Sequence, residues 1–367
     1  MTSRTRYAVA ALVAGLLTVP SAACSGGGTT TTDSFTVGLL LPSRAVPRWE
    51  HSDRPLIEQR VKQLCPHCHV TYANANDDLT TQRQQMVAMI TKGVRVLILV
   101  ATDNRAMRST VQEAHNAGVP VVAYDRLAEG PVSGYVSFDG AKVGTLQGQG
   151  LLKAMHAPAG GGGGGGGGTT VVMMNGDPTS PNAAWYKRGA LSVLRGKVRI
   201  GRSYDTPGWS TDNANANMSA AISALGLGRI DGVLAANDAM AAGVISALKT
   251  AHARRLPPVT GQDADLDAVR RIVDGEQSMT VYKSFRAEAE TAVAMALALG
   301  RGEKLHTIAT TTTDSPTTHD IPSVLLTPVA VTTANIEQTL VKDGVYTIAQ
   351  ICTPQLRAAC AKAGLTP

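Results

Sequence analysis

The chain has 367 residues, enough for two domains of ordinary size, each with its own core. A hydrophobic content of 44% beside a charged content of 17% excludes a wholly disordered chain. The net charge of +6 is spread along the sequence, and the longest basic runs are the pairs Arg254-Arg255 and Arg270-Arg271. A nucleic-acid-binding protein concentrates its basic charge on one stripe, so this distribution argues against nucleic acid as a partner.

The first 23 residues have the pattern of a signal peptide. Arg4 and Arg6 precede an apolar stretch, Tyr7–Val19, and the small residues Ser21-Ala22-Ala23 precede Cys24. The apolar stretch is too short to span a bilayer as a helix, and no later segment approaches about 18 apolar residues. The sequence therefore predicts export of the mature chain.

Two cleavage products are compatible with this N-terminus. A Cys after small residues, followed by the Gly/Thr-rich stretch within residues 24–34, indicates a lipoprotein lipidated at Cys24 and tethered to the outer face of the cytoplasmic membrane. Ser21 stands where such signals usually carry Leu, so cleavage after Ala23 and a free periplasmic or secreted protein remain the alternative. We favour the lipoprotein because it leaves an even number of cysteines.

The other four cysteines predict two disulfides, with three possible connectivities. The pairs Cys65–Cys68 and Cys352–Cys360 need the least chain closure. A redox Cys-x-x-Cys motif or a zinc site is the alternative at Cys65–Cys68. The pair precedes a predicted strand instead of a helix, and adjacent ligands fit tetrahedral zinc poorly, which favours a structural disulfide.

From Phe35 onward, short β-branched runs alternate with stretches of helical periodicity. The predicted strands are Thr36–Leu41, Val70–Ala73, Arg95–Val100, Val119–Ala123, Val136–Phe138, Thr170–Met174, Val198–Tyr204, Gly232–Ala235, Val259–Gly261 and Met279–Tyr282. The predicted helices are Thr80–Lys92, Asn104–Ala117, Ala141–Met155, Asn182–Leu194, Asp212–Leu225, Asp238–Ala251, Asp265–Asp274 and Arg286–Leu299. Gly93, Gly118, Gly226 and Gly275 follow helices as C-terminal caps do. This α/β order predicts two parallel sheets, because ten strands make an unusually wide single sheet.

The run Gly160–Gly168 stands between a predicted helix and a predicted strand. Nine glycines carry no side chain that could pack, so we expect a disordered surface loop. A phosphate-binding loop needs Lys and Ser/Thr after its glycines and then a helix, whereas a strand is predicted to follow here.

Charged, amide and indole side chains follow the predicted strands. They are Arg48, Trp49, Asp125, Arg126, Asp139, Asn182, Trp209, Asn237, Asp238, Gln262, Asp263, Asp265 and Lys283. Ligands of parallel sheets gather at these strand ends. Carboxylates accept from sugar hydroxyls, Arg, Lys and Asn donate to them, and an indole covers a pyranose face, so the set predicts a sugar site.

Such a site would pair its own ions, for example Asp125 with Arg126 or Asp263 with Lys283. Taken singly, these residues have commoner roles. Asp125, Asn182 and Asp238 could be helix N-caps, a lone Arg or Lys could be solvated, and a lone Trp could belong to the core.

Six motifs of the chain occur in the order and spacing of one known family. They are Tyr124-Asp125-Arg126, Ser137-Phe138-Asp139, Gly208-Trp209, Asn237-Asp238-Ala239, Gly261-Gln262-Asp263-Ala264-Asp265 and Met279-Thr280-Val281-Tyr282-Lys283. Between about Phe35 and Gly344 the chain closely resembles the xylose-binding branch of bacterial periplasmic sugar-binding proteins, the binding components of ABC sugar importers. It departs from that branch at Pro42–Arg44, which lacks an acidic pair, at Pro181-Asn182, where a double Asn is usual, and at the polyglycine run.

The resemblance implies the type I periplasmic-binding protein fold: two similar doubly wound parallel-sheet lobes joined by a three-strand hinge. The implied N-terminal lobe is 35–139 with 284–327, and the implied C-terminal lobe is 140–283 with 328–367. The implied sugar contacts are Arg48, Trp49, Asp125, Arg126, Asn182, Trp209, Asn237, Asp263 and Lys283.

These observations lead us to expect a monomeric solute-binding lipoprotein that delivers a monosaccharide, D-xylose above others, to an ABC permease. A sugar sensor for a membrane signalling receptor, or a binder of glucose, arabinose or galactose, is the alternative. We expect no cofactor, metal or catalysis, since Asp263 and Asp265 are too close in sequence to flank a glycosidic bond. A transcription repressor of similar core is discarded, because a signal peptide occupies the place of its DNA-binding helices.

Overall fold

The computed structural model describes residues 34–155 and 168–366. The predicted signal peptide, the lipidation site at Cys24, the tether before Ser34 and the polyglycine run up to Gly167 lie outside these residues. Within the described ranges, no helix has the length and apolar character needed to cross a membrane.

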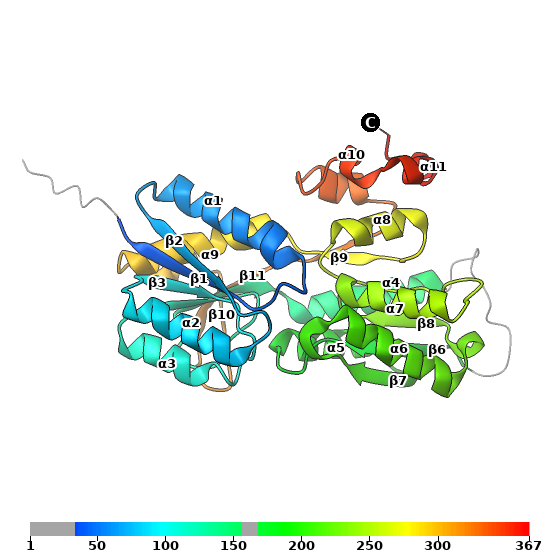
Figure 1. Ribbon diagram of the computed structural model, residues 1–367, viewed down its shortest axis with the longest axis horizontal. Helices are drawn as coiled ribbons and strands as arrows, with labels where there is room; N and C mark the ends of the chain where they lie inside the picture. The colour runs from blue at the N-terminus through cyan, green and yellow to red at the C-terminus, as the bar shows by residue number, and fades with distance from the viewer. Residues whose placement is uncertain (1–33, 156–167, 367) are drawn as a thin grey trace, which may run out of the picture. The chain divides into compact units, whose positions relative to one another are not determined.

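The larger sheet has seven strands. They are β1 (Thr36–Leu41), β2 (His69–Asn74), β3 (Val96–Leu99), β4 (Val121–Tyr124), β5 (Gly134–Phe138), β10 (Thr311–Thr313) and β11 (Ile321–Leu326), in the order β10-β11-β5-β4-β3-β1-β2. All pairs are parallel except β10–β11. Helices α1 (Arg54–Leu64) and α9 (Phe285–Gly300) cover one face, and α2 (Leu79–Thr91) and α3 (Arg108–Asn116) cover the other (Figure 1).

Two smaller sheets complete the architecture. Strands β6 (Thr170–Asn175), β7 (Arg199–Asp205) and β8 (Gly232–Ala235) form a parallel sheet in the order β7-β6-β8, and β9 (Thr280–Tyr282) pairs antiparallel with β12 (Val329–Val331). The helices of this part are α4 (Gly140–Met155), α5 (Pro181–Leu194), α6 (Thr211–Leu225), α7 (Asp238–Thr250), α8 (Leu266–Asp274), α10 (Ile348–Ile351) and α11 (Arg357–Lys362). Helices α4 and α5 pack so closely that a Cβ added at Gly144 would overlap the backbone of Tyr186.

The chain passes three times between the seven-stranded sheet and the smaller sheets, after β5, after β9 and after β11. Every strand of the larger sheet falls within 35–139 or 284–327, and every strand of the smaller sheets falls within 140–283 or 328–367. The strands thus support the division into two lobes that we propose from the resemblance.

Most predicted elements form within a few residues of their expected bounds, and the four C-terminal cap glycines all have positive φ. The prediction of a strand at Val259–Gly261 is wrong. Only Val259 makes a single bridge, to Val233, because the chain then turns away to carry Gln262 and Asp263. Strands β10, β11 and β12 and the helices α1, α10 and α11 are absent from the predicted elements.

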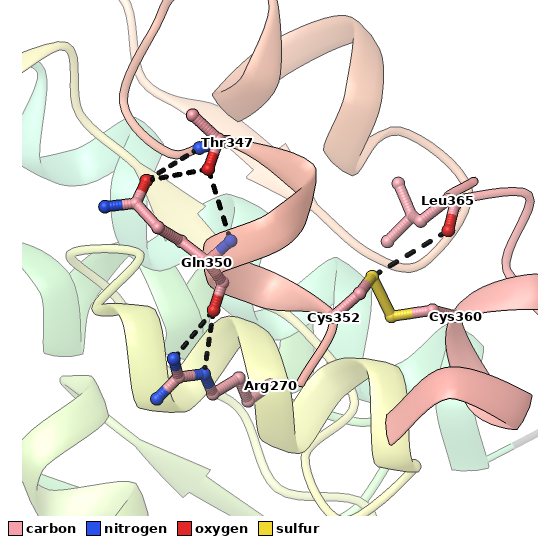
Figure 2. Close-up of a disulfide and its surroundings, with 6 residues drawn as sticks. All are labelled: Arg270, Thr347, Gln350, Cys352, Cys360 and Leu365. Atoms are coloured by element: carbon pink, nitrogen blue, oxygen red, sulfur yellow. Dashed lines mark hydrogen bonds between the residues drawn. A yellow bond between two sulfur atoms is a disulfide. The ribbon is translucent and has the colours of Figure 1, made fainter. Parts of the chain in front are cut away.

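The cysteines lie in the two predicted local pairs. The sulfurs of Cys65 and Cys68 are 2.04 Å apart between α1 and β2, and those of Cys352 and Cys360 are 2.02 Å apart between α10 and α11 (Figure 2). Within the residues that the structure covers, no group of three or more His, Cys, Asp and Glu side chains is arranged to hold a metal ion.

Candidate functional site

A cavity lies where the loops after several strands converge, and its empty space, part of it open to solvent, is about 270 Å³. It is lined by Val46, Arg48, Trp49, Asp125, Arg126, Asn182, Tyr186, Trp209, Asn237, Gln262, Asp263 and Lys283. All nine residues predicted as sugar contacts are in this set. The structure therefore brings together side chains that are up to 235 positions apart in sequence, from Arg48 to Lys283.

Three lining residues are not among the predicted contacts. Tyr186 lies one helical turn after Asn182 on α5, and this i, i+4 spacing could have identified it. Gln262 follows a predicted strand but is not among the residues that the resemblance implies, and the apolar side chain of Val46 gives no polar signal.

Arg48 is the most densely paired side chain of the site. Its guanidinium donates to both carboxylate oxygens of Asp53, at 2.9 and 2.8 Å, to Glu288 Oε2 at 2.9 Å and to Asp125 Oδ2 at 2.9 Å. The rings of Trp49 and Phe285 lie over the guanidinium, each with its centroid 4.2 Å away. Burial lowers the pKa of Arg48, but these carboxylates outweigh burial and raise it above its ordinary value. Arg48 is a fixed cation.

Asp53 and Glu288 are buried acids that pair with Arg48 but do not line the cavity. Burial raises the pKa of Asp53, although Arg48 and the hydroxyl of Tyr124, which donates to Asp53, oppose the rise. Burial raises the pKa of Glu288 well above its usual value, and its Oε1 has no partner among the described residues. Neither acid follows a strand, so the strand-end pattern could not find them.

Asp125 accepts three hydrogen bonds inside the cavity wall. Lys283 Nζ donates at 3.0 Å and Arg48 at 2.9 Å to one oxygen, and Asn182 Nδ2 donates at 2.7 Å to the other. Burial raises the pKa of Asp125, but Lys283 and Arg48 outweigh it and bring the pKa far below its usual range. Asp125 therefore stays ionised.

The ion pairs differ in part from those expected. Lys283 Nζ lies 3.2 Å from Asp263 Oδ1, as expected. The expected pair of Asp125 with Arg126 is wrong, because Asp125 has φ of 58° and its carboxylate turns to Arg48 and Lys283. Arg126 instead donates to the carbonyl of Ala101 at 3.1 Å, its one hydrogen-bond acceptor in the described part of the chain.

Three buried polar atoms of lining residues have no hydrogen-bond partner within the described ranges. They are the indole nitrogens of Trp49 and Trp209 and Oδ1 of Asn182. Buried polar atoms in native proteins are nearly always satisfied, so such a group at one cavity indicates a polar ligand. Tyr186 supports Trp209 edge-on, with ring centroids 6.1 Å apart. Aromatic surface beside unpaired donors and acceptors suits a molecule with several hydroxyls.

The helix-cap alternative holds for a different residue than expected. Asn237 is the N-cap of α7, and its side chain accepts from the amide of Met240 at 2.9 Å while the residue also lines the cavity. Asp238 lies inside the helix and accepts from Gln277, Thr280 and the amide of Asp265. Asp139 caps α4 by accepting from Lys142 N, away from the cavity lining.

Comparisons with known proteins agree with this geometry. A model of the periplasmic binding protein domain matches residues 37–304. The chain is 34% identical over 316 residues to the D-xylose-binding periplasmic protein of Escherichia coli strain K12, covering 84% of this chain and 90% of that protein. It is 33% identical over 338 residues to the multiple sugar-binding periplasmic receptor of Rhizobium radiobacter, covering 87% and 93%.

Solved structures give the same result. An ABC transporter solute-binding protein from Clostridium phytofermentans with bound β-D-glucose superposes with a TM-score of 0.75 at 30% identity, covering 86% of this chain and 99% of that chain. One from Chloroflexus aurantiacus in complex with D-glucose also has a TM-score of 0.75, at 27% identity. By the reach of the family match and of these relatives, the chain belongs to the periplasmic binding protein family and is a solute-binding protein, not an enzyme.

Proposed function

We propose that the protein is the solute-binding component of an ABC sugar importer and that it binds one monosaccharide in the cavity of about 270 Å³. The observation that carries this proposal is the set of unpartnered buried polar atoms on Trp49, Trp209 and Asn182, beside cations and carboxylates that are already paired. A neutral polyhydroxy ligand adds hydrogen bonds to such a wall without adding charge.

D-xylose is the sugar we favour. Two relatives are named as D-xylose-binding periplasmic proteins, and both cover most of this chain. The structures with bound glucose show that related sites accept a hexose, which differs by one hydroxymethyl group. A single side chain in the cleft can decide between the two.

The experiment is isothermal titration of residues 33–367 with D-xylose, D-glucose, L-arabinose, D-galactose, D-ribose and myo-inositol. We expect micromolar or tighter binding of one sugar, lost in Trp209→Ala, weakened but still measurable in Asp263→Asn, and kept in Asp139→Asn, the matched change at an exposed cap. Saturable hexose binding without a xylose response would reassign the sugar. A folded, ligand-free protein that binds none of the six would remove the proposed function.

We further propose export and lipidation at Cys24, with the tether leaving the lobes free to close over the sugar. Labelling of the protein with a fatty-acid analogue in its own cells tests this, and Cys24→Ala is expected to abolish the label and release the protein. Label that persists in the variant contradicts lipidation at this residue.

A receptor-linked sensor is the second candidate, because one relative is named as a multiple sugar-binding receptor. Crosslinking of the sugar-loaded protein in membranes distinguishes the two: an importer component is captured with a permease, and a sensor with a signalling protein.

A further inference from the structure

The loop that carries Asp263 has an unfavourable backbone. Asp263 has φ of 102° and Ala264 has φ of 55°, so two successive residues with side chains lie in the left-handed region. Such conformations persist only where the surrounding structure holds them. The position of the Asp263 carboxylate, which lies 3.2 Å from Lys283 at the cavity, therefore depends on the contacts that hold this loop.

Three of those contacts come from strand β9 and from α7. The amide of Asp263 donates to Val281 O at 3.0 Å, and the amide of Ala264 donates to Thr280 Oγ1 at 3.1 Å. The amide of Asp265 donates to Asp238 Oδ2 at 3.0 Å. These bonds hold the N–H side of the loop.

The fourth contact comes from the C-terminal segment and holds the carbonyl side. The hydroxyl of Tyr346 donates to the carbonyl oxygen of Ala264 at 3.1 Å. Burial raises the pKa of Tyr346, so the hydroxyl keeps its proton across the neutral range. Tyr346 lies after residue 304, where the family match ends.

The segment around Tyr346 is itself anchored, as Figure 2 shows. Arg270 on α8 donates to the carbonyl of Gln350 through two nitrogens, at 3.2 and 2.7 Å, and Thr347 forms a capping box with Gln350 at the start of α10. The Cys352–Cys360 pair closes the segment, and buried Cys360 and Leu365 belong to the same core cluster as Ala264. The segment is therefore a firm support and not a loose tail.

From these contacts we infer that Tyr346 is a positioning residue of the sugar site, acting through Ala264 on Asp263. The inference rests on the proposed function, because the contact between Tyr346 and Ala264 matters for affinity only if the cavity binds a sugar. Tyr346 does not line the cavity, so it acts on affinity only through the loop.

The first test measures the loop without any sugar. Hydrogen exchange of the ligand-free protein, followed by mass spectrometry over peptides spanning 261–266, compares the natural chain with Tyr346→Phe. We expect exchange in these peptides to quicken at least about tenfold, the scale of one lost hydrogen bond. Tyr72→Phe removes a hydroxyl that donates to Glu50 and is expected to leave the same peptides unchanged. Unchanged exchange in Tyr346→Phe would overturn the proposal.

The second test is a double-mutant cycle on sugar affinity. Tyr346→Phe is expected to weaken binding by about five- to tenfold in the natural chain and by less than about twofold in Asp263→Asn, since Tyr346 affects the sugar only through the Asp263 carboxylate. An equal loss in both backgrounds means a general structural effect and refutes the positioning role. If the natural chain binds no sugar, the proposed function fails, while the exchange experiment still decides whether Tyr346 holds the loop.

Discussion

Arg48 and Arg126 are both buried and both line the cavity, but their surroundings differ. Arg48 is bound by Asp53, Asp125 and Glu288, whereas Arg126 donates to one backbone carbonyl. A buried cation with several carboxylate partners holds the fold together, because its removal leaves those acids unpaired. A buried cation with spare donors is suited to a ligand.

The two arginines should therefore respond differently to substitution. Arg48→Met is expected to lower the free energy of unfolding by about 3–5 kcal/mol. Arg126→Met is expected to change the unfolding free energy by no more than about 1 kcal/mol, because burial lowers the pKa of Arg126 and disfavours its charge. The same variant is expected to lose sugar affinity, because it removes the spare guanidinium donors. Urea unfolding and titration calorimetry on both variants check this, and equal destabilisation by the two would contradict it.

Asp238 should make stability depend on pH. Burial raises its pKa to about 7, against the opposing effects of Arg271, Gln277 and Thr280. The folded protein thus binds this proton more tightly than the unfolded chain does, so the stabilisation is present below pH 4 and is lost as pH rises toward 7.

We expect the unfolding free energy to fall between pH 5 and pH 7 by up to about 1.4 kcal/mol per pH unit, and Asp238→Asn to flatten this slope. Urea titrations at pH 5, 6 and 7 measure it. Burial also raises the pKa of Asp265, a change of the same sign, so the comparison with the variant isolates Asp238. A slope that is the same in both proteins would contradict the assignment.

Among the elements, the glycine at the end of β6 decides where Trp209 lies. A Cβ at Gly176 would overlap the indole of Trp209, although the backbone of Gly176 suits any residue. Gly176→Ala should therefore displace the indole and weaken sugar binding by about tenfold or more, on the scale of one lost aromatic contact. Gly228→Ala is the control, since a Cβ there meets nothing within 4 Å. Tryptophan fluorescence and calorimetry report the two effects, and unchanged values in Gly176→Ala would contradict this prediction.

The elements that the sequence predicts well are those with buried, continuous apolar runs. The strand β1 is buried from Val37 to Leu41, and its pattern is plain in the sequence. The strand β10 is three threonines inside a longer threonine run, and α10 has four residues, so neither has a period to detect.

The site divides in the same way. Residues just past strand ends could be predicted, because parallel sheets converge at that edge. The residues that hold the lining residues in place could not be predicted: Glu288 is 240 positions from Arg48, and Tyr346 is 82 positions from Ala264. Their pairing depends on how distant segments pack, which no local pattern encodes. The positive φ of Asp125, Trp209 and Asp263 could not be predicted either, because residues other than glycine rarely adopt the left-handed region.

At the scale of the whole molecule, hydrogen bonds join the two proposed lobes. The amide of Asn104 donates to Thr179 O at 3.1 Å. The hydroxyl of Thr179 lies 3.1 Å from Thr102 O and 2.6 Å from Asp177 Oδ1, so its one proton is shared between these two acceptors. Residues 102–104 belong to one proposed lobe and Thr179 to the other. None of Thr102, Asn104 and Thr179 lines the cavity, and we expect their bonds to favour a closed arrangement of the lobes.

Thr179→Val keeps the shape of the side chain and removes the hydroxyl contacts to Thr102 and to Asp177. Because apparent affinity scales with the population of the binding-competent form, we expect sugar binding to weaken by about three- to fivefold at unchanged thermal stability of the ligand-free protein. Thr145→Val, which loses a hydroxyl bond within α4, is the matched control. Calorimetry and thermal unfolding measure both, and a loss of stability without a change in affinity would contradict a role in closure.

The pairing of cations and acids around the cavity has a consequence for what can enter. Arg48 and Lys283 are already neutralised by Asp125 and its neighbours, and Arg126 lies near the carboxylates of Asp125, Asp177 and Asp77. A sugar phosphate would bring nearly two negative charges, and a sugar acid one, to a place where Arg48 and Lys283 already have carboxylate partners and Arg126 has three carboxylates nearby. We therefore expect the cavity to bind molecules that differ from its sugar only by an added acidic group more weakly than the sugar itself.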